Sequence, residues 1–188
     1  MSETEEERGV TKDVERKGGR QVKLLIVSTL EREANQDFQN LLSKECELIA
    51  TKEYVIKNCI GCNSCWVRTP GKCAIKDDFE FIFQKILLSD TVLFLTEEKM
   101  GFVSYEMKNI VDRMIAIDLP FTNIYGRQAR HAPRYDKSWN FMLVCPKLTE
   151  KEYLSEWLGR MALNFHSASL GVFESSDREG IKDAIRNC

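Results

Sequence analysis

The fold class is indicated first by the stretch LLIVSTLEREAN, residues 24–35. Its first four residues form an uninterrupted apolar run, which is typical of a β-strand that is covered on both faces of a sheet. The polar residues behind this run lead into a helix that carries Phe38, Leu41 and Leu42 on its apolar side. A buried strand followed by a helix is the unit from which parallel α/β sheets are built.

The rest of the chain repeats this alternation. Further strands are predicted within residues 47–56 and at residues 91–95, 141–144 and 169–173. Connections that return over a helix make neighbouring strands parallel. The pattern therefore predicts an α/β fold, namely a flavodoxin-like three-layer sandwich with a five-stranded parallel sheet in the order 2-1-3-4-5 and helices on both faces.

Amphipathic helices are predicted between these strands. The clearest apolar face consists of Phe79, Ile82, Phe83, Ile86 and Leu87. Asp77 and Glu80 have the spacing of a capping box, which predicts that this helix begins at Asp77. On a later helix, Arg113 follows Asp112 and is interpreted as part of an ion pair on the helix surface. Residues 118–138 are predicted to form a long irregular connection.

Composition and charge narrow the class of protein. The 188 residues suit one domain over residues 21–188, preceded by a charged tail at residues 1–20 that is predicted to be disordered. The net charge of −2 gives no reason to expect a nucleic acid or a membrane surface as a partner. No apolar run approaches the roughly 18 residues of a membrane helix, and the acidic start is unlike a secretory signal, so a cytoplasmic location is expected.

Four of the seven cysteines, Cys59, Cys62, Cys65 and Cys73, fall within fifteen residues. An odd total in a reducing compartment argues against a disulfide framework. The spacing C-x2-C-x2-C-x7-C is related to the close cysteine runs with which bacterial ferredoxins bind iron–sulfur clusters. Two alternatives stay open from spacing alone: a zinc ion bound by four thiolates, and free thiols that pack or exchange redox equivalents.

The loop after the first strand is a candidate phosphate site. It runs into a helix N-terminus, where free N–H groups and the helix dipole favour an anion. Ser28, Thr29 and Asn35 are predicted to add hydrogen bonds, and Arg32 a positive charge. The alternative is an ordinary polar turn, because the loop has no glycine and carries carboxylates that repel a phosphate if they point inward.

The loop after the third strand, residues 96–105, reaches the same edge of the sheet. Its backbone amides are predicted to face the edge of a flavin ring, on which Phe102 or Tyr105 packs. The alternative for these aromatic side chains is a place in the core. The predicted cofactor-binding residues of this loop are Thr96, Glu97, Met100, Gly101, Phe102 and Ser104.

The cysteine segment at residues 59–78, CIGCNSCWVRTPGKCAIKDD, resembles that of the NADPH-dependent FMN reductase and iron–sulfur flavoprotein group. Residues 101–113, 131–137 and 162–166 resemble further signatures of this group, although Glu97 stands where the family has a proline. The resemblance implies a flavodoxin-like fold, noncovalently bound flavin mononucleotide (FMN) and association into homodimers or homotetramers. It also implies that the four clustered cysteines bind a [4Fe–4S] cluster that passes electrons to FMN.

These observations predict an FMN-dependent oxidoreductase. The flavin carries the chemistry: it takes a hydride from NAD(P)H or an electron from the cluster, and passes electrons to a small-molecule or protein acceptor. No side chain is therefore assigned as a catalytic acid or base. A second hypothesis is a flavin reductase without metal, whose cysteines are free or redox-active. A third is a flavin-free binding or electron-carrier protein on the same scaffold, whose cysteines bind zinc or stay free.

Overall fold

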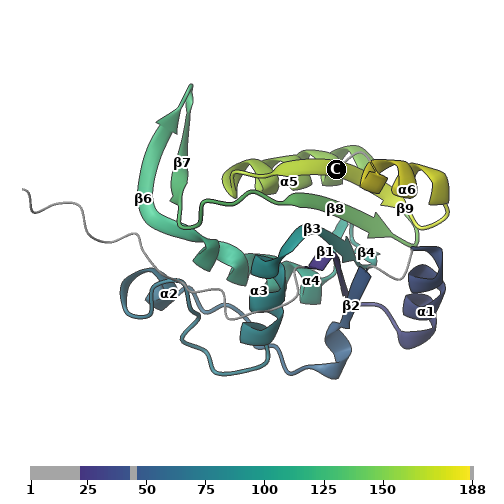
Figure 1. Ribbon diagram of the computed structural model, residues 1–188, viewed down its shortest axis with the longest axis horizontal. Coiled ribbons are helices and arrows are strands. Elements are labelled where there is room, and N and C mark those ends of the chain that lie inside the picture. Colours follow the sequence, from purple (N-terminus) through teal and green to yellow (C-terminus); the bar gives the residue numbers. More distant parts are fainter. Residues whose placement is uncertain (1–21, 43–45, 187–188) are drawn as a thin grey trace, which may run out of the picture.

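A five-stranded parallel sheet organises the computed structural model, which describes residues 22–42 and 46–186 (Figure 1). The predicted tail at residues 1–20 lies outside the described residues. The strands of the sheet are β1 (Val22–Ser28), β2 (Cys46–Ala50), β3 (Ser89–Leu95), β8 (Asn140–Cys145) and β9 (Ala168–Glu174). They are arranged β2-β1-β3-β8-β9, and all neighbouring pairs are parallel. This is the predicted order 2-1-3-4-5, so the flavodoxin-like topology is confirmed.

Helices cover both faces of the sheet and complete three layers. One face packs against α1 (Arg32–Leu41) and α6 (Arg178–Arg186). The other face packs against α3 (Phe79–Leu88), α4 (Tyr105–Arg113) and α5 (Lys151–Asn164). Among the helices of residues 22–42 and 46–186, none has the length and apolar character needed to span a lipid bilayer.

The apolar run in β1 explains why the sheet is buried on both sides. Leu25 and Val27 point into the larger core cluster, and Leu24 and Ile26 point into the smaller one. Because side chains alternate along a strand, a strand between two helical layers needs apolar residues at every position.

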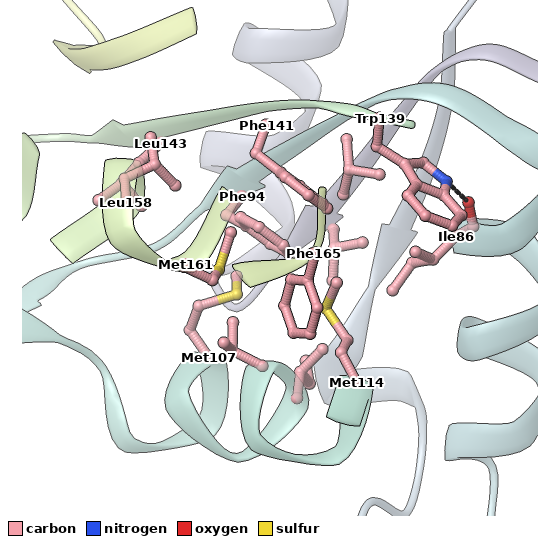
Figure 2. Packing of buried hydrophobic residues seen from close by; sticks show 14 of the residues in the cluster. Ile86, Phe94, Met107, Met114, Trp139, Phe141, Leu143, Leu158, Met161 and Phe165 are labelled. Atoms are coloured by element: carbon pink, nitrogen blue, oxygen red, sulfur yellow. Dashed lines mark hydrogen bonds between the residues drawn. The ribbon is translucent and has the colours of Figure 1, made fainter. Parts of the chain in front are cut away.

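Aromatic and methionine side chains fill the larger core (Figure 2). The rings of Phe94 and Phe141, on adjacent strands, are nearly parallel with centroids 5.8 Å apart. The indole N–H of Trp139 donates to the carbonyl oxygen of Ile86 at 2.8 Å, so the polar end of this buried side chain is satisfied.

The prediction of an irregular connection at residues 118–138 is wrong. Strands β6 (Asp118–Tyr125) and β7 (Gln128–Pro133) form an antiparallel hairpin that projects from the body of the molecule (Figure 1). The two strands pair up to Tyr125 and Gln128, which leaves a two-residue turn at residues 126–127. Gly126 has φ of 62°, a conformation that suits glycine and is typical of such tight hairpin turns.

Smaller elements connect these layers. They are the single-turn helices η1 (Thr51–Glu53) and η2 (Met114–Ile117), the short helix α2 (Ser64–Val67) and the two-stranded ribbon of β4 (Glu98–Lys99) and β5 (Phe102–Val103). Helix α2 lies within the cysteine segment at residues 59–78. The β4–β5 ribbon brings the segment after β3 back toward α5, where it contributes to the candidate site.

Candidate functional site

Three hydroxyl groups meet where β1 and β3 end. The hydroxyl of Thr29 donates to that of Thr96 at 2.7 Å and lies 3.4 Å from the hydroxyl of Ser104. All three residues are buried, and Ser104 also accepts the backbone N–H of Met107 as the N-cap of α4. The chain leaves β1 toward one face and β3 toward the other, so this is the point at which open α/β sheets bind ligands.

The side chains of Ser28 and Asn35 shape the loop after β1. The Ser28 hydroxyl donates to Asn35 Oδ1 at 2.5 Å and accepts the backbone N–H of Leu30 at 3.1 Å. Asn35 Nδ2 donates to the carbonyl oxygen of Leu30 at 3.3 Å. These two predicted site residues are therefore buried and hydrogen-bonded to their own loop, whereas Arg32 is exposed in the first turn of α1. The N-cap residue of α1, Glu31, makes no capping hydrogen bond through its side chain.

The carboxylates near this edge have partners on the surface. Glu31 pairs with Lys52, and Glu97 pairs with Lys99 at 2.5 Å, which lowers the pKa of Glu97. The side chains of Glu31 and Glu97 are 79% and 54% exposed. These contacts hold both carboxylates away from the buried hydroxyl groups, so they do not fill the end of the sheet.

Glu98 binds the start of α5 across the site. Its carboxylate accepts the backbone N–H of Thr149 at 2.6 Å and that of Glu150 at 3.4 Å, together with the Thr149 hydroxyl. Partial burial raises the pKa of Glu98, but these hydrogen bonds outweigh it and the net pKa is lowered. The carboxylate thus takes the place of a side-chain cap at the N-terminus of α5, where the N-cap residue Glu150 provides none.

Replacement Glu98→Ala is expected to reduce the free energy of unfolding by about 1 kcal/mol, the typical value of a lost helix cap. Glu97→Ala is the matched control, because an exposed pair such as Glu97–Lys99 contributes about 0–1 kcal/mol. Urea denaturation of both variants checks the difference. Equal stability of the two variants would show that the Glu98 contacts do not stabilise α5.

The remaining predicted residues of this loop lie apart from the hydroxyl groups. Met100 and Gly101 form the turn between β4 and β5 with φ of 55° and 77°, and the Met100 side chain is fully exposed. Phe102 packs edge-on against Trp157 with centroids 5.0 Å apart, and its ring also lies 6.0 Å from that of Tyr153. The structure therefore brings Thr29, Thr96 and Ser104 together and directs Phe102 toward α5.

A cavity of about 200 Å³ lies at the same edge, between α1 and α6. Leu30 from the first loop and Ala34 from α1 line one side, and Ser175 and Arg178 line the other. Small-molecule sites usually have roughly 300–1,000 Å³. The cavity therefore holds part of a nucleotide-sized ligand at most, and the remainder would lie along the open edge of the sheet.

The four clustered cysteines share one side of the molecule, beside α4. Cys59 and Cys62 are exposed, whereas Cys65 and Cys73 are half-buried. Burial raises the pKa of Cys65, and the neighbouring Cys73, Cys59 and Cys62 raise it further. Hydrogen bonds from Ser64 lower the pKa of Cys62. Over residues 22–42 and 46–186, no three cysteine, histidine or acidic side chains converge as a metal site.

A buried ion pair ties the cysteine segment to α4, and sequence reasoning missed it. Arg113 binds Asp77 through two hydrogen bonds of 2.6 and 2.9 Å, while Asp112 pairs with Lys108 on the surface. The interpretation of Arg113 as a surface partner of Asp112 is therefore wrong. The helix predicted to begin at Asp77 begins at Phe79, with Asp78 as its N-cap residue. The spacing along the helix could have indicated that Arg113 is buried, because residue 113 lies three positions after Ile110 on the apolar side.

Trp66 anchors the cysteine segment to the β6–β7 hairpin. Its indole N–H donates to the carbonyl oxygen of Ile115 at 3.1 Å, and its ring lies 4.7 Å from that of His131. Gly71 has φ of 77°, and a Cβ atom there would lie 3.2 Å from Arg134 and from Tyr135. Trp66 therefore contacts η2 and β7, and the turn at Gly71 contacts the residues that follow β7.

Comparison with known proteins connects this chain to two curated relatives. It is 36% identical over 72 residues to the iron–sulfur flavoprotein of Archaeoglobus fulgidus, a match that covers 38% of this chain and 34% of the relative. It is 32% identical over 77 residues to an iron–sulfur flavoprotein of Methanocaldococcus jannaschii, a match that covers 41% of this chain and 39% of the relative. Over these residues, this chain is similar to iron–sulfur flavoproteins. The matches span little more than a third of these iron–sulfur flavoproteins, and no family model matches the chain.

Solved structures agree with this flavodoxin-like fold. RosB with bound 8-demethyl-8-formylriboflavin-5′-phosphate has a TM-score of 0.60 at 11% identity, over 88% of this chain and 76% of RosB. An azoreductase from Bacillus anthracis has a TM-score of 0.53 at 11% identity, over 88% of this chain and 96% of the azoreductase. At such low identity these structures support the flavodoxin-like fold alone.

Proposed function

We propose that this chain binds FMN at the carboxyl ends of β1 and β3 and acts as a flavin-dependent oxidoreductase. The observation that carries the proposal is the buried hydroxyl group of Thr29 beside those of Thr96 and Ser104, with the nearby carboxylates paired elsewhere. The names of the curated relatives and the flavin phosphate in RosB support it. When bound, FMN would accept a hydride from NAD(P)H and pass electrons to a small-molecule or protein acceptor.

In this proposal, some residues of the first loop shape the FMN site and others bind the phosphate. Ser28 and Asn35 fix the shape of the loop through their mutual hydrogen bond. The free N–H groups at the start of α1 and the exposed side chain of Arg32 receive the phosphate. The segment from Thr96 to Ser104 then lies along the ring, on the side of the sheet that leads to α4.

The cysteine segment fits an iron–sulfur cluster by its donor set. Cys59, Cys62, Cys65 and Cys73 supply four thiols on one side of α4, close enough for three of them to affect Cys65. Arg113 adds a buried N–H group, Nε, that has no hydrogen-bond partner among the described residues. A [4Fe–4S] cluster bound there would supply single electrons. The phenol of Tyr105, next to the Ser104 cap, donates to Asn58 at 3.4 Å, so the cysteine segment begins beside the proposed flavin site.

A second candidate is a flavin-free carrier or binding protein whose cysteines bind zinc or remain free. It is favoured by the open arrangement of the thiols, because no three ligand side chains converge in the part of the chain that the structure describes. Iron, zinc and flavin analysis after anaerobic purification separates the two candidates. Assembly into homodimers or homotetramers remains part of the proposal, and gel filtration of the same sample tests it.

Replacement Arg32→Ala tests the proposed phosphate site. A hydrogen bond to a charged group contributes about 1.5–3 kcal/mol, so the dissociation constant of FMN should rise about tenfold or more. Riboflavin, which lacks the phosphate, should bind the variant and the wild type equally. Arg186→Ala at the end of α6 is the matched control, because Arg186 is exposed and pairs with Asp183 one turn earlier on the same helix. Equal FMN affinity in Arg32→Ala and wild type would contradict this position for the phosphate.

A further inference from the structure

The ion pair of Asp77 and Arg113 is almost completely removed from solvent. The side chain of Arg113 is 0% exposed and that of Asp77 is 1% exposed. Nη1 of Arg113 donates to Asp77 Oδ2 at 2.6 Å, and Nη2 donates to Asp77 Oδ1 at 2.9 Å. A buried pair of this kind is a costly way to obtain stability alone, because both charges lose their hydration. Its position at the cysteine segment therefore needs a further explanation.

The pair joins both ends of the cysteine segment to α4. Nη1 of Arg113 also donates to the carbonyl oxygen of Lys57 at 2.9 Å, and Asp77 Oδ2 accepts the backbone N–H of Lys57 at 2.8 Å. Asn109, one turn earlier on α4, donates to the same carbonyl oxygen at 3.1 Å and accepts the backbone N–H of Cys59 at 3.0 Å. Lys57 and Asp77 lie just outside the first and last of the four cysteines. The chain thus enters and leaves the segment at one fixed place.

One hydrogen-bond donor of this arrangement is left without an acceptor. Nε of Arg113 is buried and has no hydrogen-bond partner among the described residues. The face of the guanidinium packs on the ring of Phe79 with its central carbon 4.2 Å from the centroid. Cys73, four residues before Asp77, is the neighbouring acceptor: burial lowers the pKa of Arg113, whereas its interactions with Asp77 and with Cys73 raise it, although no contact from Nε to the sulfur has hydrogen-bond geometry. A buried donor without a partner costs about 1–3 kcal/mol, which favours a state in which an acceptor approaches it.

We propose that Arg113 is a positioning residue for Cys73: its Nε–H donates to the Cys73 sulfur when that sulfur is a metal-bound thiolate. The proposal rests on the ligand set given above as part of the proposed function, but it does not depend on FMN. Cys59 and Cys62 are exposed, and the hydrogen bonds that Cys62 receives come from its sequence neighbour Ser64 and not from a buried side chain. Cys73 is therefore the ligand that a buried side chain of α4 would position.

A hydrogen bond to a ligand sulfur has measurable consequences. It stabilises the more negative, reduced state of an iron–sulfur cluster and so raises the reduction potential. Loss of an outer partner of a metal ligand typically lowers metal affinity by about 10–100-fold. Lysine in place of Arg113 keeps a positive charge but lacks the planar guanidinium group. Only that group can bind two carboxylate oxygens and donate from Nε at the same time.

The first experiment compares wild type, Arg113→Lys and the control Lys108→Gln after anaerobic reconstitution with ferrous iron and sulfide. Lys108 lies on the exposed face of the same helix, so this control removes a charge without touching the cysteine segment. In Arg113→Lys we expect a more negative midpoint potential and release of iron to a chelator that is about 10–100-fold faster. Lys108→Gln should match wild type. Unchanged potential and unchanged release in Arg113→Lys would overturn the proposal.

A second measurement uses unmodified protein, in case Arg113→Lys does not fold. Wild type labelled with 15N-arginine is loaded with 113Cd2+, and the Arg113 Nε–H resonance is followed by NMR. A scalar coupling between this proton and cadmium, transmitted through the sulfur, is expected. A cadmium-loaded protein without the coupling would overturn the proposal, as would thiols that bind neither cadmium nor iron. Failure to bind FMN affects only the flavin part of the proposed function.

Discussion

Replacement Arg113→Met is expected to reduce the free energy of unfolding by about 3–5 kcal/mol, because it leaves the Asp77 carboxylate buried without its counter-charge. Burial raises the pKa of Asp77, but hydrogen bonds from Arg113 and from the backbone N–H of Lys57 outweigh it and lower the pKa in the folded protein. The contribution of this carboxylate is therefore present above its unfolded pKa of 3.8 and is lost as the pH falls below it. Urea denaturation at neutral pH measures the effect.

Two further variants identify the cause of this loss. Lys108→Met removes the exposed pair with Asp112 on the same helix and should cost only about 0.3–0.5 kcal/mol. The double variant Asp77→Leu with Arg113→Met removes both charges and should recover much of the stability lost in Arg113→Met. If the double variant is less stable than Arg113→Met alone, the unpaired carboxylate is not the reason for the loss.

Replacement Asp118→Asn is expected to stabilise the protein at alkaline pH and to have much less effect at acidic pH. Asp118 is 3% exposed at the base of β6, and its Oδ1 has no hydrogen-bond partner among the described residues. Burial raises its pKa from 3.8 to about 7, although the charge of Arg134 acts in the opposite direction. Folding therefore keeps a proton that the unfolded chain releases, so wild-type stability falls as the pH rises from about 4 to about 7.

The size of this effect follows from the change in pKa. At about 1.4 kcal/mol for each pKa unit, and reduced for residual solvation, the gain in Asp118→Asn at pH 8 relative to pH 4 is about 2–4 kcal/mol. Denaturation of wild type and variant at both pH values measures it. The exposed Asp136→Asn is the control, which should change stability by less than about 0.5 kcal/mol at either pH. A gain that is equal at both pH values would show that Asp118 does not titrate between them.

The sheet could be predicted from sequence because its strands are buried on both faces. Apolar runs such as those at residues 24–27, 91–95 and 141–144 have few alternatives to a strand between two helical layers. The strand order was predicted from the number of strands and the chain length, which suit the flavodoxin topology, and it is confirmed.

Elements held by distant partners could not be predicted in the same way. The β6–β7 hairpin carries exposed Phe121 and Ile124 and lacks a regular apolar alternation, so only the turn at Gly126 indicated it. The N-terminus of α5 is capped by Glu98, fifty-one residues before Thr149, and not by a neighbour in sequence. A local capping pattern cannot reveal a partner that arrives through the fold.

The candidate site was predicted in part. The two loops at the end of the sheet do bring Thr29 together with Thr96 and Ser104, as expected for loops after adjacent parallel strands. The direction in which each side chain points could not be predicted from the sequence pattern. Glu97 is held outward by Lys99, and Phe102 is turned toward Trp157 on α5. The roles of the other predicted site residues stay predictions.

Titration of FMN into flavin-free wild-type protein under anaerobic conditions tests the central claim most directly. Quenching of flavin fluorescence should show a single saturable site with a dissociation constant of about 1 μM or below, equivalent to about 8 kcal/mol of binding free energy. The flavin absorbance bands should shift on binding, and the shift should disappear when the protein is unfolded with denaturant. A chain that is folded by circular dichroism and binds no FMN at about 1 mM would contradict the account.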